Sequence, residues 1–408
     1  MKNDVIIIGG GAAGLCAAVA VKQKNPALTV RLLEALPRVG KKLAATGNGR
    51  CNITNKNIVK ERYHGKNTDF AVCALARFGG EKTEKFFHGI GVDFVFEGDK
   101  GYPASLQAAS VVDCLRFAAE EAGVIVCTET RVTNIQLSGG LFKVIAGNMS
   151  FLSKNVIIAA GLLSGGERLG SDGQMLALLK KAGFKTEKTY PAIVQLKTPP
   201  ETVRQLKGIK VNATVSLKSG GRLLRQEYGE VLFCDYGLSG PPVLQVSGAA
   251  ALAQSPVISL DLMPDKSLQA LTNELCERIA MLGGRSIDEF FTGMMNKRLG
   301  QVIIKAAGYK LNTPVFSLDK NAPQRMAALI KDFSLAVTGN TGFINSQVTS
   351  GGLDTEQFNP ETMMSREYKG LYAIGEILDI DGDCGGFNLQ WAWSSALCAA
   401  EAIAGEMK

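Results

Sequence analysis

Residues 5–34 read VIIIGGGAAGLCAAVAVKQKNPALTVRLLE, and this stretch decides the fold. A β-branched run over residues 4–8 is followed by an alanine-rich helical pattern that continues to about Lys24. Between the two lie three glycines in G-x-G-x-x-G order, namely Gly9, Gly11 and Gly14. The pattern predicts a strand, a tight turn and a helix, which form the first unit of a parallel sheet.

The glycine spacing points to a cofactor that contains a pyrophosphate. Gly9 permits the turn, Gly11 lets the backbone approach the phosphates, and Gly14 lets the helix pack on the strand. The first helical residues, Ala12 and Ala13, would aim unpaired N–H groups at the anion.

An acid completes this pattern. A second apolar run over residues 28–33 ends on Glu34, twenty residues after Gly14. Its carboxylate can accept hydrogen bonds from a ribose diol, and its charge disfavours a 2′-phosphate at that position. We place the neighbouring Ala35 in the same site. A lone glycine triplet also occurs in ordinary βαβ turns, but triplet, strand, helix and acid together favour a dinucleotide.

Composition limits the class of protein. The 408 residues exceed what one hydrophobic core usually spans, so we expect two or three domains. A hydrophobic content of 46% and a charged content of 20% exclude a disordered or fibrous chain. No apolar run reaches the roughly 18 residues that cross a bilayer, and no signal peptide precedes the first strand, so we expect a cytoplasmic protein. The net charge of +7 is mild and spread out, which argues against a nucleic-acid partner.

Cysteine and histidine usage argues against metal chemistry. The nine cysteines include no C-x-x-C pair, which disfavours a disulfide framework, a zinc site and a dithiol redox centre. The two histidines, His64 and His88, have no ligand spacing, and we interpret them as structural or surface groups.

Residues 36–55, LPRVGKKLAATGNGRCNITN, are too rich in glycine and asparagine for a regular element. The glycines would let backbone N–H groups converge on an anion, and nearby cations would neutralise it. These cations are Arg38, Lys41, Lys42 and Arg50. We therefore predict a phosphate-facing loop, against the simpler interpretation of a basic surface loop.

Three segments together resemble one bacterial flavoprotein family. They are the glycine-rich first unit with Glu34, the stretch ATGNGRCNITN at 45–55, and GLYAIGEILDIDGDCGGFNLQWAWSSA at 370–396. The family includes BaiN-type reductases, YhiN-like proteins and aminoacetone oxidases. The resemblance covers essentially the whole chain and implies bound FAD.

The resemblance also implies cofactor contacts. In glutathione-reductase-like FAD domains an acid after the last strand binds the ribityl chain, which corresponds to Glu376 here, and the strand around Val132 passes the adenine. The segment ending in Ala160 and Gly161 lacks the threonine that many such domains have. The helix from Asn388 should point its N-terminus at the flavin pyrimidine and stabilise negative charge on the reduced ring. The predicted contacts are Gly9, Gly11, Ala12, Ala13, Gly14, Glu34, Ala35, Arg38, Lys42, Asn48, Gly49, Arg50, Cys51, Asn52, Val132, Ala160, Gly161, Gly375, Glu376, Gly385, Gly386, Phe387 and Asn388.

From about residue 190 the sequence changes to β-like runs followed by helical apolar spacing at about 265–332. We predict an α/β protein with a discontinuous glutathione-reductase-like FAD domain, residues 1–189 and 340–408, and an inserted β-rich plus helical domain, 190–339. The insert has no second G-x-G-x-x-G, so NAD(P)H would act as a transient reductant beside the flavin rather than in its own Rossmann unit.

The main functional hypothesis is an oxidoreductase in which FAD exchanges hydride with a small organic or alicyclic substrate held between the domains, such as a BaiN-like NAD(P)H-dependent enone reductase. The alternatives are an amine or aminoketone oxidase that uses oxygen, an RNA-modifying flavoprotein, and a flavin-binding protein without turnover. Cys51, Cys384 and Tyr102 are considered for chemistry, but packing roles are favoured for each. No proton donor or other catalytic residue is identified, and no oligomeric state is predicted.

Overall fold

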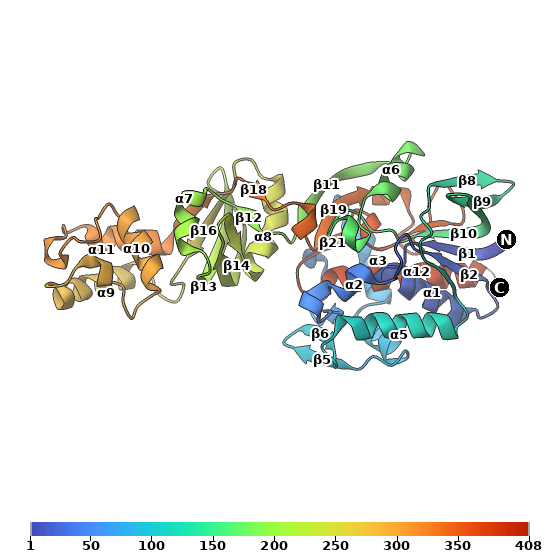
Figure 1. Cartoon of the computed structure of the whole chain (residues 1–408), viewed down its shortest axis with the longest axis horizontal. Helices are drawn as coiled ribbons and strands as arrows, with labels where there is room; N and C mark the ends of the chain where they lie inside the picture. Colours follow the sequence, from blue (N-terminus) through green and yellow to red (C-terminus); the bar gives the residue numbers. More distant parts are fainter. Residues whose placement is uncertain (1, 407–408) are drawn as a thin grey trace. The chain divides into compact units, whose positions relative to one another are not determined.

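The computed structural model describes residues 2–406, and the chain divides into two compact units (Figure 1). The first unit contains the residues up to Pro191 and those from Phe343 onward, and the second is Ala192–Gly342. The limits proposed from the sequence are 189/190 and 339/340. Within the described residues, no helix is long and apolar enough to cross a membrane.

The first unit is built on a seven-stranded sheet in the order β7-β2-β1-β10-β9-β8, with β20 paired to β10. The strands around β1 are parallel, and Ile8 pairs with Leu33 on one side and Ile158 on the other. The other edge is an antiparallel meander, because β8, β9 and the first half of β10 fold back on one another. The strands are β1 (Lys2–Ile8), β2 (Val30–Leu33), β7 (Ile125–Cys127), β8 (Asn134–Ser138), β9 (Leu141–Ala146), β10 (Met149–Ile158) and β20 (Leu371–Ala373).

Three helices, α1 (Ala12–Lys24), α5 (Ala108–Glu121) and α12 (Phe387–Glu406), pack together beside this sheet (Figure 1). The helix α1 is buried from Ala13 to Val21, because small alanine side chains let it approach α12 and the sheet closely. Smaller elements complete the unit: α2 (Lys41–Ala44), α3 (Asp69–Arg77), α4 (Gly80–His88), α6 (Gln174–Lys181), β3 (Thr54–Asn55), β4 (Tyr63–His64), β5 (Phe94–Glu97), β6 (Lys100–Pro103), β11 (Thr186–Ala192), β19 (Val348–Leu353) and β21 (Asp381–Gly382).

Local sequence patterns mislead at three places. The apolar runs at residues 150–152 and 156–160 predict two separate strands, but β10 is continuous from Met149 to Ile158. The paired glycines Gly351 and Gly352 predict a turn, but they lie inside β19. Ser171 is a plausible cap for α6 by its residue type, but the helix begins after Gly173, and Asp172 accepts the hydrogen bond from Gln174 N.

The second unit has its own sheet, in the order β17-β16-β13-β14-β15-β12-β18, and its own hydrophobic core. The helix α8 begins at Pro241, where a missing N–H costs nothing. A helical part follows. The apolar spacing of residues 287–295 predicts a helix, but the structure has only a 3₁₀ turn over Ile287–Glu289 there. The elements are β12 (Leu196–Lys197), α7 (Pro200–Val203), β13 (Lys210–Ser219), β14 (Arg222–Phe233), β15 (Gly237–Ser239), α8 (Pro241–Leu252), β16 (Val257–Asp261), α9 (Leu268–Leu282), α10 (Lys297–Ala306), α11 (Ala322–Lys331), β17 (Phe333–Ala336) and β18 (Gly339–Asn340).

Candidate functional site

Four sequence-predicted segments meet at one edge of the first unit's sheet. Glu34 follows β2, Gly9 follows β1, Ala160 follows β10 and Glu376 follows β20. Because these strands are parallel neighbours, their carboxyl ends lie at the same edge. Glu34 and Glu376 are separated by three strand spacings, roughly 14 Å at about 4.8 Å each. An extended ligand with a ribose near one end and a polyol near the other matches this arrangement.

The turn before α1 is closely packed on one side and open on the other. A Cβ on Gly14 would lie 1.9 Å from the carbonyl oxygen of Gly9, so only glycine fits there. A Cβ on Gly11 would meet nothing within 4 Å. Within residues 2–406, no backbone acceptor takes the N–H groups of Ala12, Ala13 or Gly14. These three N–H groups at the helix start therefore have no backbone acceptor, which is the arrangement that binds phosphates.

The Glu34 carboxylate is anchored to the backbone around this turn. Its Oε2 accepts from Gly10 N at 2.7 Å and its Oε1 from Leu36 N at 2.8 Å. The Glu34 carbonyl oxygen accepts from Thr130 N at 2.8 Å, which brings the segment containing the buried Val132 to the same end of the site. Ala35 is half-buried beside it. Carboxylates have about four lone-pair positions, so Glu34 retains capacity for a ribose diol.

The Glu376 carboxylate lies in a second polar cluster. It accepts from Lys42 Nζ and from the Ser164 hydroxyl, at 2.5 and 2.6 Å. It also accepts from Thr349 N at 2.8 Å. Ser164 is fully buried and was missed by the sequence analysis. Ser164 lies three residues after Gly161 in the sequence.

Gly375 and Gly161 connect this cluster to the rest of the edge. Gly375 has φ of +69°, and a Cβ there would lie 3.0 Å from the Cβ of Ala13. A Cβ on Gly161 would lie 3.5 Å from Glu376 Oε2. Because neither glycine has a side chain, Gly375 can lie close to the start of α1 and Gly161 close to the Glu376 carboxylate.

The loop over residues 46–52 has an unusual backbone. Gly47, Asn48, Gly49 and Cys51 all have positive φ, and residues 47–49 are exposed. Arg50 N and Cys51 N donate to the carbonyl oxygens of Gly47 and Thr46, both at 3.1 Å, so the loop closes on itself. Lys42, from α2, lies next to Glu376 rather than at the surface.

Arg50 and Arg38, two of the cations predicted to face a phosphate, lie apart from the other site residues or have another partner. Arg50 forms an ion pair with Glu97, and its guanidinium lies 4.4 Å from the centre of the Tyr102 ring. Arg38 is exposed, and no contact in the described residues ties it to the other site residues. Tyr102 is buried and packs under Arg50, which matches the packing role favoured for it.

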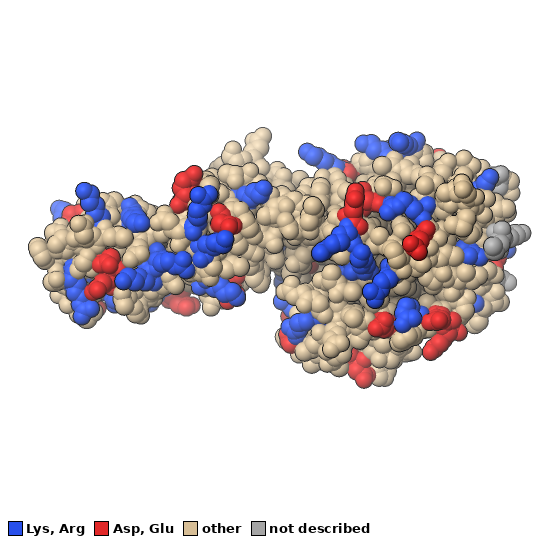
Figure 2. All heavy atoms as spheres, viewed as in Figure 1, with Lys and Arg blue, Asp and Glu red and all other residues tan. Residues whose placement is uncertain are grey.

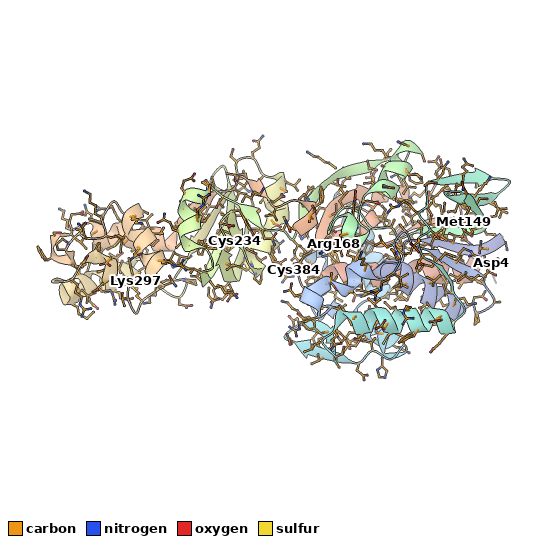
Figure 3. The ribbon with its side chains drawn as sticks, viewed as in Figure 1. Asp4, Met149, Arg168, Cys234, Lys297 and Cys384 are labelled. Carbon is orange, nitrogen blue, oxygen red and sulfur yellow. The ribbon has the colours of Figure 1, made fainter. Side chains whose placement is uncertain are left out.

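Burial raises the pKa of the two thiols near the site, Cys51 and Cys384. Cys51 is fully buried, and burial raises the pKa of its thiol to about 12. Cys384 is half-buried in the turn before α12 (Figure 3), and burial raises its pKa as well. Nucleophilic chemistry needs the thiolate, and burial disfavours it at both cysteines, in line with the packing roles favoured for them.

The N-terminus of α12 packs against the 46–55 segment. A Cβ on Gly386 would lie 2.5 Å from the Thr54 carbonyl oxygen and 2.8 Å from Asn52 Oδ1. Asn52 Oδ1 is buried, and no hydrogen-bond partner for it is found in the described part of the chain. Gly385 adjoins the same segment, because Asn55 Nδ2 donates to its carbonyl oxygen at 2.8 Å.

The side chains at the start of α12 have structural contacts. Asn388 closes the preceding loop by accepting from Gly382 N and donating to Gly382 O, at 2.8 and 2.7 Å. Phe387 packs edge-on against Tyr63. Trp391 and Trp393 are both buried and donate to the carbonyl oxygens of Gly375 and Ile53. The side chains of Phe387 and Asn388 therefore have structural partners, and their predicted cofactor contacts stay a prediction.

These residues fit FAD. The free N–H groups of α1 suit the pyrophosphate, and the two acids suit ribose and ribityl hydroxyls. Asn52 Oδ1, beside Gly386, is a buried acceptor without a partner in the described residues, so it is available to a donor on the cofactor. The predicted contacts form three groups, around Glu34, around Glu376 and around Asn52, and Arg38 stands apart from them.

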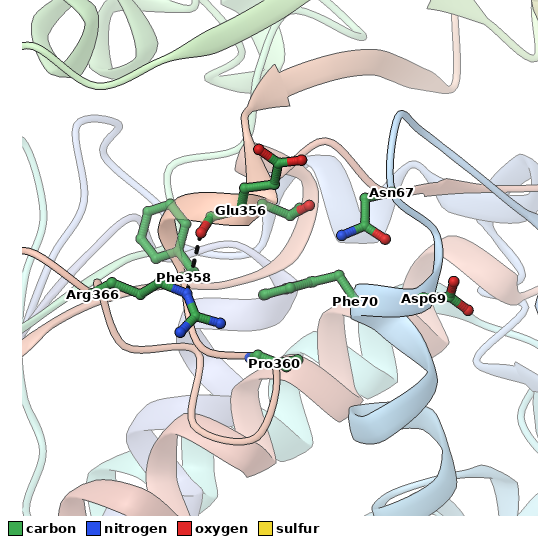
Figure 4. A pocket seen from close by; sticks show the side chains of 8 residues that line it. Asn67, Asp69, Phe70, Glu356, Phe358, Pro360 and Arg366 are labelled. Atoms are coloured by element: carbon green, nitrogen blue, oxygen red, sulfur yellow. Dashed lines mark hydrogen bonds between the residues drawn. The ribbon is translucent and has the colours of Figure 1, made fainter.

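A hollow of about 390 Å³ lies elsewhere on the first unit, at the start of α3 (Figure 4). Phe70, Phe358 and Pro360 form its apolar wall, and Arg366 donates to the Glu356 carbonyl oxygen at its rim. It contains none of the predicted cofactor residues. Phe70 packs edge-on against Trp391, and Trp391 Nε1 donates to the Gly375 carbonyl oxygen.

Comparison with known proteins agrees with this geometry. The family model described as the HI0933-like protein Rossmann domain matches residues 3–402. The chain is 34% identical over 406 residues to the 3-dehydro-bile acid delta(4,6)-reductase of Clostridium scindens, covering 98% of this chain and 99% of that protein. It is 30% identical over 414 residues to the ribosomal RNA dihydrouridine synthase of Escherichia coli K12, covering 99% and 98%.

Solved structures confirm the fold class. The quinol fumarate reductase subunit FrdA of E. coli, with an E245Q mutation, aligns with a TM-score of 0.53 at 16% identity, over 99% of this chain and 70% of that one. A quinol-fumarate reductase with menaquinol aligns with a TM-score of 0.51 at 15% identity, over 99% and 71%. At such identities the likeness shows the fold alone.

The family match over nearly the whole chain confirms the predicted FAD-binding Rossmann fold with its inserted strand-rich part, and confirms FAD as the cofactor. The chain belongs to the HI0933-like Rossmann-domain family and is an FAD-dependent oxidoreductase.

Proposed function

We propose that this protein reduces a carbon–carbon double bond conjugated to a carbonyl group in a small alicyclic substrate. The observation that carries the proposal is the 34% identity, over 98% of the chain, to a protein named for reducing the delta(4,6) positions of a 3-dehydro-bile acid. The amine or aminoketone oxidase considered from the sequence has no comparable support.

The predicted contact residues would hold the cofactor. Glu34 binds its adenosine ribose, the N–H groups of residues 12–14 bind its pyrophosphate, and Glu376 binds its ribityl chain. When bound, FAD supplies hydride, with both electrons, to one carbon of the double bond. The N-terminus of α12, which begins at Phe387, would stabilise negative charge on the reduced ring.

The two electrons must come from a further donor. The sequence offers no second glycine-rich nucleotide fingerprint, so we assign this role to a nicotinamide that visits the flavin and leaves.

A second candidate function is reduction of a uridine in RNA. It is favoured by the 30% identity, over 99% of the chain, to a ribosomal RNA dihydrouridine synthase. Residues 192–342 also carry 17 lysines and arginines against 12 acids. Figure 2 shows many of these cations on one face of the second unit. The chemistry is shared, because the uracil double bond is also conjugated to a carbonyl.

One experiment separates the two candidates. FAD-loaded protein is incubated without oxygen with NADH or NADPH, and with either a 3-oxo-4,6-diene bile acid or a uridine-containing ribosomal RNA transcript. We expect nicotinamide oxidation that depends on the bile acid and a product heavier by two hydrogens. Turnover of the RNA alone would replace the first proposal by the second, and turnover of neither would refute both.

A further inference from the structure

A cavity of about 570 Å³ lies within the second unit and has no part in the function proposed above. Its walls come from β13, β14, the segment 262–266, helix α9 and the segment 293–299 at the start of α10. None of the predicted cofactor residues lines it. A cavity of this size accommodates a small ligand or a single nucleotide of a longer chain.

One wall of the cavity carries an exposed aromatic ring. Tyr228 is 63% exposed, although it lies in the middle of β14. Side chains alternate along a strand, so Tyr228 projects from the sheet face opposite to that of the buried Val231. Three half-buried methionines line the same cavity, namely Met263, Met294 and Met295. Aromatic rings and thioethers are surfaces on which a flat base packs well.

The charges that line the cavity balance one another. Lys210 and Lys266 each form an ion pair with an acid. Arg278 and Asp265 add one charge of each sign. Asn212 supplies an amide, which can both donate and accept hydrogen bonds. A neutral lining with polar groups and an open ring suits an uncharged heterocycle better than a phosphate.

Exposed cations cover the helix beside this cavity. One side of α10 is buried at Leu299, and its other side carries Arg298 and Lys305 in solvent. These two cations are seven residues apart, so they share a face and lie about 10 Å apart along the axis. Lys305 Nζ donates to Gln205 Oε1 at 3.1 Å, which places the 3₁₀ turn over Arg204–Leu206 beside α10. We define the basic patch by its exposed cations, Arg204, Lys207, Lys297, Arg298 and Lys305.

Most of the basic patch is not neutralised. Lys207 pairs with Asp235 at 2.6 Å, and Lys297 Nζ (Figure 3) lies 4.0 Å from Asp288 Oδ2. Among residues 2–406, no acid lies within ion-pair distance of the other cations of the patch. A row of Lys and Arg side chains binds a chain of phosphates. The basic patch therefore matches a strand of nucleic acid by charge.

The cavity and the basic patch are continuous. Asn296, which lines the cavity, directly precedes Lys297 of the patch. Lys210, which also lines the cavity, follows Lys207 of the patch by three residues. A chain that alternates phosphates with flat bases can therefore lie along the patch and place one base in the cavity.

We propose that the second unit binds single-stranded RNA, with phosphates on the basic patch and one base stacked on Tyr228 in the cavity. The assignment deepens the second candidate function and rests on it for its purpose, while binding is measured apart from turnover. A duplex fits less well, because its bases are stacked on each other and cannot reach a protein ring. A polyanion without bases leaves the cavity unused.

The first test measures binding of a fluorescent oligouridine RNA to the FAD-loaded full chain, without nicotinamide so that nothing is reduced. Affinity should fall steeply with salt, because phosphate contacts release counterions. Tyr228→Ala should weaken binding roughly 5- to 150-fold, the usual contribution of one stacked base, and Tyr228→Phe should restore it. Phe316→Ala is the matched control, because Phe316 is 73% exposed in the same unit but does not line the cavity.

The second test removes charge from the basic patch. Replacing both Arg298 and Lys305 by Gln should reduce the slope of log affinity against log salt by about 1.4, since each single-strand phosphate contact contributes about 0.7. Replacing the exposed Lys180 and Lys181 of α6 by Gln removes the same charge from the first unit and should leave the slope unchanged. Inorganic polyphosphate should bind the patch, and Tyr228→Ala should not affect it.

Three results would overturn the proposal. They are absence of oligouridine binding at low salt, wild-type affinity in both the Tyr228→Ala and the patch variants, and equal weakening of RNA and polyphosphate by Tyr228→Ala. Uridine reduction is scored separately. RNA binding through these residues without reduction would refute the second candidate function and leave the binding site standing. Wild-type reduction rates in both variants at limiting RNA would refute the binding site.

Discussion

Lys42 Nζ lies 2.5 Å from Glu376 Oε2, although 334 positions separate the two residues. The contact joins the basic loop after Glu34 to the last strand of the sheet, so the two ends of the chain share one polar cluster. Ser164 bridges the pair, because its hydroxyl contacts both.

Glu376→Ala should weaken FAD binding roughly 10- to 100-fold, because a hydrogen bond to a charged group contributes about 1.5–3 kcal/mol. The change removes the proposed ribityl acceptor and leaves Lys42 and Ser164 without their shared partner. Flavin fluorescence on titration of FAD-free protein measures the affinity. Ser164→Ala, which leaves the carboxylate in place, should have a smaller effect, and equal affinities for wild type and Glu376→Ala would contradict the assignment.

Gly11→Ala and Gly14→Ala should fail in different ways. A Cβ on Gly11 meets nothing within 4 Å, so Gly11→Ala should fold with nearly wild-type stability and yet bind FAD weakly, since the methyl group enters the proposed pyrophosphate space. A Cβ on Gly14 would collide with the Gly9 carbonyl oxygen, so Gly14→Ala should lose stability in the FAD-free protein.

Urea unfolding without FAD and FAD titration distinguish the two outcomes. Tight FAD binding by Gly11→Ala would show that the cofactor does not approach this turn. If Gly14→Ala is as stable as the wild type, α1 and the end of β1 must be less closely packed than in the structure.

Cys51→Ala should retain FAD binding and turnover within a few-fold. Burial keeps the Cys51 thiol protonated at neutral pH, so it cannot act as a nucleophile. In folded protein, iodoacetamide should label the exposed Cys276 much faster than Cys51, which peptide mass spectrometry can quantify. Loss of turnover with retained FAD in Cys51→Ala would assign a chemical role to the thiol.

Local patterns predicted much of the first unit. The turn between β1 and α1 is held by contacts between residues that are close in sequence. A side chain at position 14 would collide with the Gly9 carbonyl oxygen, so the glycine spacing alone predicts this turn. Ser164 was missed because its role depends on Glu376, 212 positions away, and an isolated serine carries no signal of such a contact. The side chain of Asn388 was likewise unpredictable, because it closes a loop rather than facing outward.

Gly351 and Gly352 show how a local signal can mislead. Paired glycines usually mark turns, but here they lie in β19 with φ of +86° and +131°. Side chains at these positions would collide with the carbonyl oxygens of Lys188 and Ile377, so close approach of neighbouring backbone explains the glycines. Only the tertiary arrangement reveals that reason.

The stability of the FAD-free protein should depend on pH through Asp381. The folded pKa is raised from 3.8 to about 6, so the folded state binds the proton more tightly than the unfolded state. This contribution to stability is fully present below about pH 4 and is lost as the pH rises through about 6. The loss is about 3 kcal/mol, from roughly two pKa units at 1.36 kcal/mol each. Asp381→Asn cannot ionise, so its free energy of unfolding relative to wild type should rise by about this amount between pH 4 and pH 7. Parallel urea titrations at several pH values measure the difference, and a difference that stays constant across this range would show that Asp381 ionises alike in both states.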